Sequence, residues 1–418
     1  LVHLWGAKMV ATKSLALVAA AVLASGFACS GTAHANVRSA ESASISSASL
    51  QQRLRVSSVD YAALDDILGG IVFESGRSNR MPARGRAIRT GTRINPASNS
   101  RYRYEGNRIV FHALTAEHIE QISLYREELE QLPSQIDFDA LPENEQLAFW
   151  LNLHNIVVIE QIARSYPVSQ PRSIRAGSPR APLFDAPIVN VRGEQLSLNQ
   201  IRFDVVGRRW NDPLVIYGFY SGAVGGPSIM GRAFTGSRVW EQLSANAGEF
   251  VNSLRGIELY EQRGYQISPI YAEWRDTLFP GWPHDLRRHL DAHADYGTLD
   301  EDTREMAPEL LSFDNNIADL TNGQPACRPD STALLYSSSS SAAGDINSQG
   351  NPCTQLPAHS VQFVRVVTER RLEFLRQGRL GSVTVRDIPT SADDGRTVEQ
   401  APERVRADGS PAEEGSRP

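Results

Sequence analysis

The stretch Leu214–Arg232, LVIYGFYSGAVGGPSIMGR, is the one from which the expected fold is built. The seven residues Leu214–Tyr220 are apolar or glycine and too few for an ordinary helix, so they predict a strand buried on both faces. The strand is expected to end at Ser221, and Gly222–Pro227 are small, apolar or ring-locked. A hydroxyl beside glycines with exposed backbone N–H groups is suited to hold a nucleophile or to bind an anion. A tight turn with nothing bound explains the same residues, and this stretch alone favours that interpretation.

Residues 142–166, PENEQLAFWLNLHNIVVIEQIARSY, predict a central helix because they are apolar around most of the helical circumference. Polar side chains inside such a helix need partners or a purpose. At about 100° per residue, Glu145, Asn152 and Asn155 share one side of the helix. His154 falls roughly 160° from Asn152, so these two side chains cannot both point directly into one pocket.

Hydrophobic periodicity supplies the other elements. It predicts further helices over residues 60–71, 115–132, 198–206, 237–254, 283–293 and 360–377. It predicts short strands over residues 109–112, 188–191 and 265–270. We therefore expect a helix-rich α+β fold, with a single domain over residues 56–381 and a small central sheet. A polar linker, residues 36–55, precedes this domain, and a disordered tail, residues 382–418, follows it.

The first 35 residues are typical of a signal peptide. Lys8 and Lys13 make a positive region, Leu15–Ala24 is apolar, and Ala33-His34-Ala35 is the small-x-small pattern that precedes a cut before Asn36. The apolar run is shorter than the roughly 20 residues that a membrane span needs. We expect an exported protein, periplasmic or secreted, without a membrane span in the mature chain. A lipoprotein attached through Cys29 is the alternative.

The charge balance limits the partners. The chain has 42 basic and 48 acidic residues, and its only lysines, Lys8 and Lys13, would leave with the leader. The mature chain would then carry about −8, which gives no general attraction to nucleic acid. The missing lysines exclude a Schiff base, a phosphate-loop lysine and a lysine general base. We predict no cofactor.

Cys327 and Cys353 would remain as an even pair in an oxidising compartment, and they predict a disulfide. No metal site is predicted, because no His or Cys lies near them at ligand spacing. Residues 76–108 hold nine arginines among small and polar residues. A solvated loop is the favoured interpretation of this segment. A clamp for an anionic ligand and a docking surface for another protein are the alternatives.

Three segments together resemble the family known as domain of unknown function 547. EQLAFWLNLHN, residues 145–155, looks like the family's AFWxNxYN helix. Residues 212–235 are similar to DPRxHFALNCGAxSCP followed by a Tyr-Thr, and ISPIYAEW, residues 267–274, is similar to a segment ending in Lys-Trp-Tyr. The residues that carry the second similarity are Asp212, Pro213, Ser221, Gly222, Ala223, Pro227 and Arg232 to Thr235. The resemblance covers about residues 141–279 and implies no activity, since the family is uncharacterised.

The chain departs from this family where thiol chemistry would be expected. Ser221 and Gly226 stand at the family's two cysteine positions, and Ile216 and Phe203 stand at histidine or histidine-like positions. His154 replaces a tyrosine. A serine hydroxyl is a weak nucleophile unless an adjacent base takes its proton, and the base implied by the family is missing.

Two hypotheses follow. In the first, which we favour, the chain is a binding module or degenerate enzyme that holds a small molecule or peptide in a pocket between helix 142–166 and the turn 221–227. Its candidate ligand-binding residues are Asn152, Asn155, Gly222, Gly225 and Gly226. In the second, the chain is a hydrolase or acyl transferase with Ser221 as nucleophile, glycine-turn N–H groups as oxyanion donors and an unidentified histidine as base.

Overall fold

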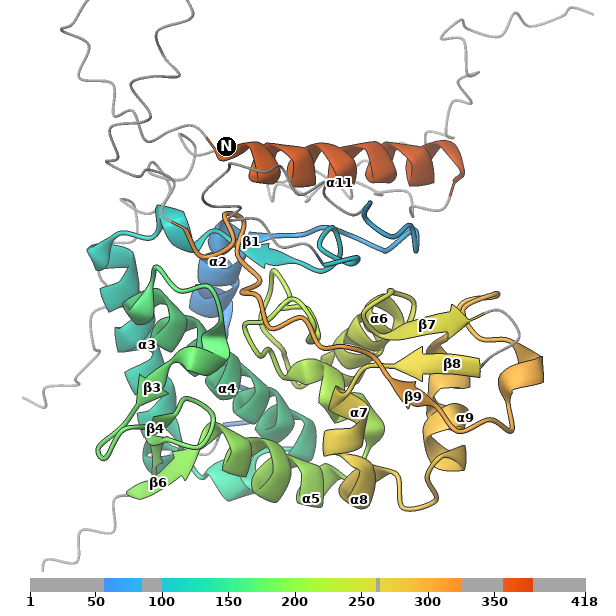
Figure 1. The fold of residues 1–418 in the computed structure, drawn as a ribbon. Helices are drawn as coiled ribbons and strands as arrows, with labels where there is room; N and C mark the ends of the chain where they lie inside the picture. The colour runs from blue at the N-terminus through green and yellow to red at the C-terminus, as the bar shows by residue number, and fades with distance from the viewer. Residues whose placement is uncertain (1–55, 85–99, 261–263, 325–355, 379–418) are drawn as a thin grey trace, which may run out of the picture. The chain divides into compact units, whose positions relative to one another are not determined.

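The structure is a computed structural model that describes residues 56–84, 100–260, 264–324 and 356–378. They form a helix-rich α+β fold, which confirms the predicted fold class (Figure 1). The α-helices are α2 (Ala62–Ile71), α3 (Ala116–Gln135), α4 (Glu143–Ser165), α5 (Arg208–Trp210), α6 (Val239–Val251), α7 (Ile270–Glu273), α8 (Arg275–Leu278), α9 (His284–His293) and α11 (Ala358–Arg376). The 3-10 helices are η1 (Phe111–Ala113), η2 (Phe138–Ala140), η3 (Pro171–Ser173), η5 (Pro213–Gly218) and η6 (Glu301–Thr303), and η4 (Gln200–Gly207) is a π-helix.

Four small sheets, rather than one central sheet, occur in the described residues. The strands are β1 (Val72–Phe73), β2 (Arg108–Ile109), β3 (Arg175–Ala176), β4 (Ala181–Pro182), β5 (Pro187–Val191), β6 (Glu194–Ser197), β7 (Ile257–Tyr260), β8 (Gly264–Ile267) and β9 (Glu309–Leu310). The pairs β1–β2, β3–β4 and β5–β6 are antiparallel. In the fourth sheet, β8 lies between an antiparallel β7 and a parallel β9. Strand residues such as Ile109, Val189 and Ile257 are buried in the same hydrophobic core as the helices.

Helix α4 lies at the centre of the hydrophobic core, as predicted. Both α3 and α6 pack against it (Figure 1). Apolar side chains on every side of α4, such as Leu147, Leu151 and Ile159, are fully buried. Burying one such side chain stabilises the fold by about 1.5–3 kcal/mol, which explains why this helix needs no polar face toward solvent.

The predicted strand Leu214–Tyr220 is wrong. Most of this run forms the 3-10 helix η5, and Phe219, which follows it, is extended. The Asp212 side chain accepts a hydrogen bond from Leu214 N–H at 2.8 Å and caps the helix, with Pro213 at its first position. A short buried apolar run has the same composition in a strand and in a buried helical turn, so periodicity does not separate them.

Gly218 explains how η5 fits between two larger helices. A Cβ atom at this position would lie 2.6 Å from Leu151 Cδ2 of α4 and 2.9 Å from Leu243 Cδ2 of α6. Both distances are too short for a side chain. The missing side chain therefore allows η5 to contact α4 and α6 at once, and it sets how closely the stretch after Asp212 approaches the central helix.

Most of the remaining predicted elements are confirmed in kind and differ at their ends. The structure places helices at five of the predicted ranges, 60–71, 115–132, 237–254, 283–293 and 360–377, as α2, α3, α6, α9 and α11. Residues 198–206 are predicted as a helix and form the π-helix η4. The strand predicted at residues 188–191 is β5, and the one predicted at 265–270 ends early, at Ile267. The strand predicted at 109–112 is wrong beyond Ile109, because Phe111–Ala113 form η1.

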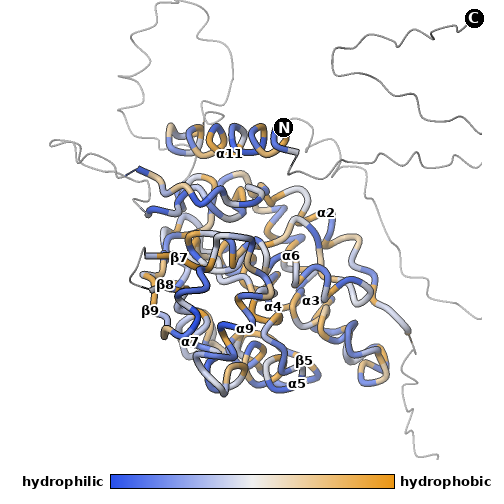
Figure 2. Tube along the Cα trace, turned by 90° about the vertical axis from the view of Figure 1, so that its right-hand side faces the viewer, coloured by the Kyte–Doolittle hydropathy of each residue, from blue (hydrophilic) through white to orange (hydrophobic). Residues whose placement is uncertain are grey.

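The chain divides into two compact units, Leu1–Glu373 and Phe374–Pro418. Of the second, the structure describes residues 374–378, the end of α11 and a turn. In Figure 2, α11 alternates between hydrophobic and hydrophilic colours, as an amphipathic helix does. In the described part of the chain, none of the helices has the length and hydropathy needed to cross a bilayer.

Several predictions lie outside the described residues. They concern the signal peptide at residues 1–35, the linker at residues 36–55, the tail at residues 382–418 and the disulfide between Cys327 and Cys353. The single domain over residues 56–381 also stays a prediction.

Candidate functional site

The two asparagines of α4 bind the backbone of the stretch Leu214–Arg232 and of Phe234, which follows it. Asn152 Nδ2 donates to Phe234 O at 2.8 Å, and Phe234 N–H donates to Asn152 Oδ1 at 2.9 Å. Asn155 makes the same pair of hydrogen bonds at the end of η5. Its Nδ2 donates to Gly218 O at 2.9 Å, and its Oδ1 accepts from Tyr220 N–H at 3.0 Å. Each amide thus replaces the partner strand that a buried extended backbone would otherwise require. Helix α4 and the central stretch are in contact, as the pocket hypothesis requires.

His154 packs edge-to-face on the ring of Phe219, with the ring centroids 4.9 Å apart, and is neutral. Its Nδ1 lies 3.0 Å from Asn155 Oδ1, and because that oxygen only accepts hydrogen bonds, the proton is assigned to Nδ1. Its Nε2 is buried without a hydrogen-bond partner in the described residues. Burial lowers the pKa of His154 to about 3, against the opposing hydrogen bond to Asn155. His154 is therefore a structural side chain with no contact to Ser221.

The turn after Ser221 uses its own backbone donors. Ala223 N–H donates to Ser221 Oγ at 3.3 Å, and Gly226 N–H donates to Ala223 O at 3.2 Å. Val224 N–H and Gly225 N–H donate to Asn316 O and Asp314 O at 2.8 and 2.9 Å. Four consecutive N–H groups, at residues 223–226, are therefore engaged within the chain.

Residues 314–318 supply two of these partners, and the sequence analysis did not single them out. They run across the turn, where Ala223 and Ile317 form an antiparallel bridge and Ala318 N–H donates to Gly222 O at 2.7 Å. Because the acceptors are backbone carbonyls, no residue type in this segment signals the contact.

Close packing explains the three glycines of the turn. A Cβ at Gly222 would lie 2.4 Å from Ile162 Cδ1, and one at Gly226 would lie 2.4 Å from Ser221 Oγ. A Cβ at Gly225 would lie 2.8 Å from Asp314 N. Ser221 is partly buried, and its only hydrogen bond within the described residues is the one from Ala223 N–H. The catalytic hypothesis requires a histidine hydrogen bond to Ser221 Oγ, and none is present in this part of the structure.

A crevice lies on the amide-bearing side of α4, next to α2 and residues 229–234. Its lining is mostly apolar and includes both asparagines: Leu64, Leu68, Asn152, Asn155, Ile156, Ile159, Ile229, Met230, Arg232 and Phe234. The space inside it that admits the centre of a water-sized sphere is about 10 Å³, room for about one water molecule. The glycine turn does not line this crevice. The crevice thus brings Asn152 and Asn155 together with residues 229–234. The candidate ligand-binding residues Gly222, Gly225 and Gly226 are not part of its lining.

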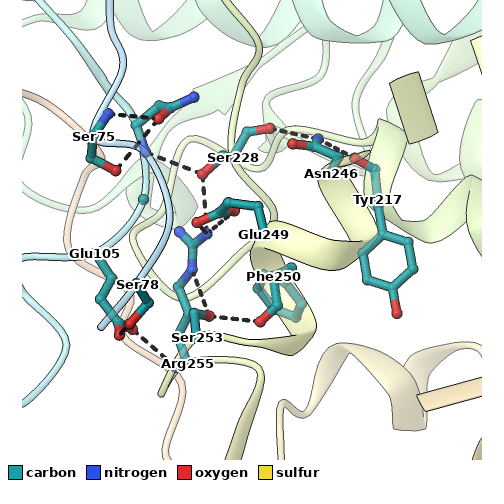
Figure 3. A network of polar contacts seen from close by, with 12 residues as sticks. Ser75, Ser78, Glu105, Tyr217, Ser228, Asn246, Glu249, Phe250, Ser253 and Arg255 are labelled. Atoms are coloured by element: carbon teal, nitrogen blue, oxygen red, sulfur yellow. Dashed lines mark hydrogen bonds and ion pairs between the residues drawn. The ribbon is translucent and has the colours of Figure 1, made fainter. Parts of the chain in front are cut away.

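A buried charged network is a second feature that sequence reasoning missed (Figure 3). The Arg255 guanidinium pairs with the Glu249 carboxylate and donates to Ser228 Oγ at 3.0 Å and to Ser253 Oγ at 3.3 Å. The Glu105 carboxylate accepts from Ser78 Oγ and from the N–H groups of Leu254 and Arg255. Burial raises the pKa of Glu105, and these hydrogen bonds oppose the rise.

Several described arginines of residues 76–108 make hydrogen bonds or ion pairs with the chain. Arg80 donates to Ile257 O at 3.0 Å, and Arg101 pairs with Glu258 at 2.6 Å. Arg108 is buried and donates to Gly106 O at 2.8 Å. In the part that the structure describes, these side chains fix the segment onto strand β7 and onto itself.

His289 forms a hydrogen-bonded cluster with Tyr217 and Tyr271. Its Nε2 lies 2.9 Å from the hydroxyl of Tyr217, which lies 3.2 Å from the hydroxyl of Tyr271. Burial, together with the neighbouring His293, lowers the pKa of His289 to about 3. No spacing in the sequence distinguishes this histidine from the others. In the described residues, no group of three or more His, Cys, Asp and Glu side chains is arranged to hold a metal ion.

Residues 138–251 match the family model described as "Protein of unknown function, DUF547". The match contains the first two motifs of the predicted resemblance and confirms it for this part of the chain; the third motif, residues 267–274, lies outside. Neither the curated proteins nor the solved structures contained a match to this chain.

Proposed function

We propose that this protein is a binding module that does not use Ser221 as a nucleophile. The observation that carries the proposal is the engagement of the N–H groups of residues 223–226 within the chain. An oxyanion hole needs backbone donors aimed at an empty position where charge develops. Here the Ser221 hydroxyl itself receives one of these donors. The hydrolase or acyl transferase alternative has no histidine at Ser221 in the described residues, and four N–H groups of its turn, at residues 223–226, already have acceptors.

The ligand site proposed here is the amide-bearing side of α4. Binding pockets are usually mostly apolar with a few polar groups that orient the ligand. The crevice has this composition, because its mostly apolar lining includes the Asn152 and Asn155 amides and the exposed Arg232. A small molecule or peptide with an apolar part and an anionic group matches it. A space of about 10 Å³ holds neither, so binding requires the covering element to move.

Export is part of the proposal and rests on the signal-peptide pattern of residues 1–35. In an oxidising compartment, the predicted disulfide between Cys327 and Cys353 would then be maintained.

Labelling with a fluorophosphonate probe tests the absence of a reactive serine. We expect the purified mature chain to show no labelling above that of the Ser221→Ala variant, because no base activates the hydroxyl. Ser237→Ala is the matched control, since Ser237 is exposed and lies outside the turn. Labelling that persists in Ser237→Ala and disappears in Ser221→Ala would establish the catalytic alternative.

A further inference from the structure

Residues 59–71 cover the polar side of α4. Leu64 and Leu68 of α2 line the crevice opposite Asn152 and Asn155. Asp65 Oδ1 accepts from Ala233 N–H at 2.6 Å, which ties α2 to the segment after the glycine turn. One helical turn before α2, Val59 N–H donates to Glu145 Oε2 at 3.4 Å. The site proposed above is thus occupied by a segment of the chain itself.

Residues 59–71 pack imperfectly against α4. Tyr61 is 3% exposed and approaches Asn152, yet its hydroxyl oxygen makes no hydrogen bond of normal geometry in the described residues. A buried hydroxyl without a partner costs about 1–3 kcal/mol. Glu145 is 8% exposed, and its contact with Val59 N–H is long at 3.4 Å. The water-sized space under Leu64 and Leu68 removes further packing contacts.

The composition of α2 weakens it further. Gly69 and Gly70 lie in its last turn, and glycine in a helix costs roughly 1 kcal/mol relative to alanine. Packing does not require the first of them, because a Cβ at Gly69 would meet only Gly231 O, at an ordinary 3.8 Å. Elements with such defects are the ones that open locally at low free energy.

We propose that α2 is an exchangeable occupant of a helix-binding groove formed by α4 and residues 229–234, and that the ligand is an amphipathic helix with the pattern of α2. This proposal rests on the binding function proposed above. The groove that α2 covers presents Ile156, Ile159 and Ile229, a shape and polarity that suit apolar side chains at helical spacing. Leu64, Leu68 and Ile71 have this spacing in α2 and are buried.

Charge complementarity specifies the ligand helix more closely. The Ala233 N–H group needs an acceptor, and Arg232 at the rim is cationic and exposed. Asp65, directly after the first apolar position, meets the first requirement, and a second carboxylate follows at Asp66. A ligand helix should therefore carry apolar residues at relative positions 1, 5 and 8 and an acid at position 2, as Leu64 to Ile71 does.

A fluorescein-labelled peptide of residues 59–73, VDYAALDDILGGIVF, tests the exchange by fluorescence anisotropy on the purified mature chain. We expect weak binding to the wild type, because the tethered α2 competes at a millimolar effective concentration. Asp65→Ala should raise the affinity about ten-fold by removing a charge-assisted hydrogen bond that holds α2. Gly69→Ala should lower it about five-fold by stabilising the resident helix.

Asp66→Ala is the matched control, because it removes the same charge from an exposed neighbour without a hydrogen bond to residues 229–234 in the described structure. A peptide with asparagine in place of Leu64 and Leu68 should not bind. If the Asp65→Ala, Asp66→Ala and Gly69→Ala proteins bind the peptide with equal affinity, the proposal is overturned. If Asp65→Ala does not fold, the comparison of Gly69→Ala with the wild type is the test. Labelling of Ser221 would overturn the binding function itself, whereas a failed peptide titration without labelling overturns only the exchange.

Discussion

Asn155→Ala should destabilise the protein by about 3–9 kcal/mol. The substitution leaves three groups without partners inside the core: Gly218 O, Tyr220 N–H and the Nδ1–H of His154. Each unsatisfied buried polar group costs about 1–3 kcal/mol. Since natural domains are stable by only about 5–15 kcal/mol, this variant should lie close to the threshold of folding. Urea unfolding followed by tryptophan fluorescence measures the change.

Asn144→Ala is the control for that measurement. Asn144 lies in the first turn of the same helix, but it is exposed and makes a single side-chain contact, with Trp240 Nε1 at 2.8 Å. Its loss should cost no more than about 1 kcal/mol. Equal destabilisation by the two variants would contradict the structural role of the Asn155 amide.

Gly106→Ala should destabilise the protein by about 3–5 kcal/mol. Gly106 has φ +74°, and a Cβ there would lie 1.8 Å from Arg255 Nη1 and 2.8 Å from Arg255 Cζ. Arg255 cannot move aside without leaving Glu249 and Ser228, and breaking a buried ion pair costs about 3–5 kcal/mol. Thermal or urea unfolding of the purified variant checks this value.

Gly76→Ala separates the clash from the backbone strain. Gly76 has nearly the same φ, +71°, but a Cβ there would meet nothing within 4 Å. Its substitution should cost only the strain of a left-handed backbone, about 1–2 kcal/mol. Equal losses of stability in the two glycine variants would show that the Arg255 network of Figure 3 can move to accept the extra methyl group.

The part of the fold that the sequence predicts well is the part set by local patterns. Helix α4 follows from its apolar circumference, and the common side of Asn152 and Asn155 follows from the helical repeat. Thr115 predicts the start of α3 because its hydroxyl accepts the N–H group of His118, three residues later. These features need no knowledge of which distant segments meet.

The failures concern contacts between segments far apart in the chain. The run Leu214–Tyr220 is apolar because it is buried, and burial alone does not distinguish a strand from the 3-10 helix that Asp212 caps. Glu105 receives its hydrogen bonds from Leu254 and Arg255, about 150 residues away, so no spacing reveals them. The role of the turn after Ser221 also depends on distant carbonyls, at Asp314 and Asn316.

The candidate site shows the same division. The sequence identifies the correct side of α4, because polar residues in a buried helix need partners. It does not reveal that Asn152 and Asn155 bind backbone groups of Phe234, Gly218 and Tyr220, or that α2 covers these amides. Amphipathic spacing predicts that Leu64 and Leu68 face a core, but it does not say which helix they meet.

Amide hydrogen exchange at Val224 and Gly225 tests most directly whether the turn after Ser221 is structural. Both N–H groups donate to carbonyls of residues 314–316. We predict that they exchange only through large opening reactions, with opening free energies near that of global unfolding. Exchange at the rate of a free peptide would contradict this, because the donors would then be open to a bound anion and the catalytic role of Ser221 would regain its support.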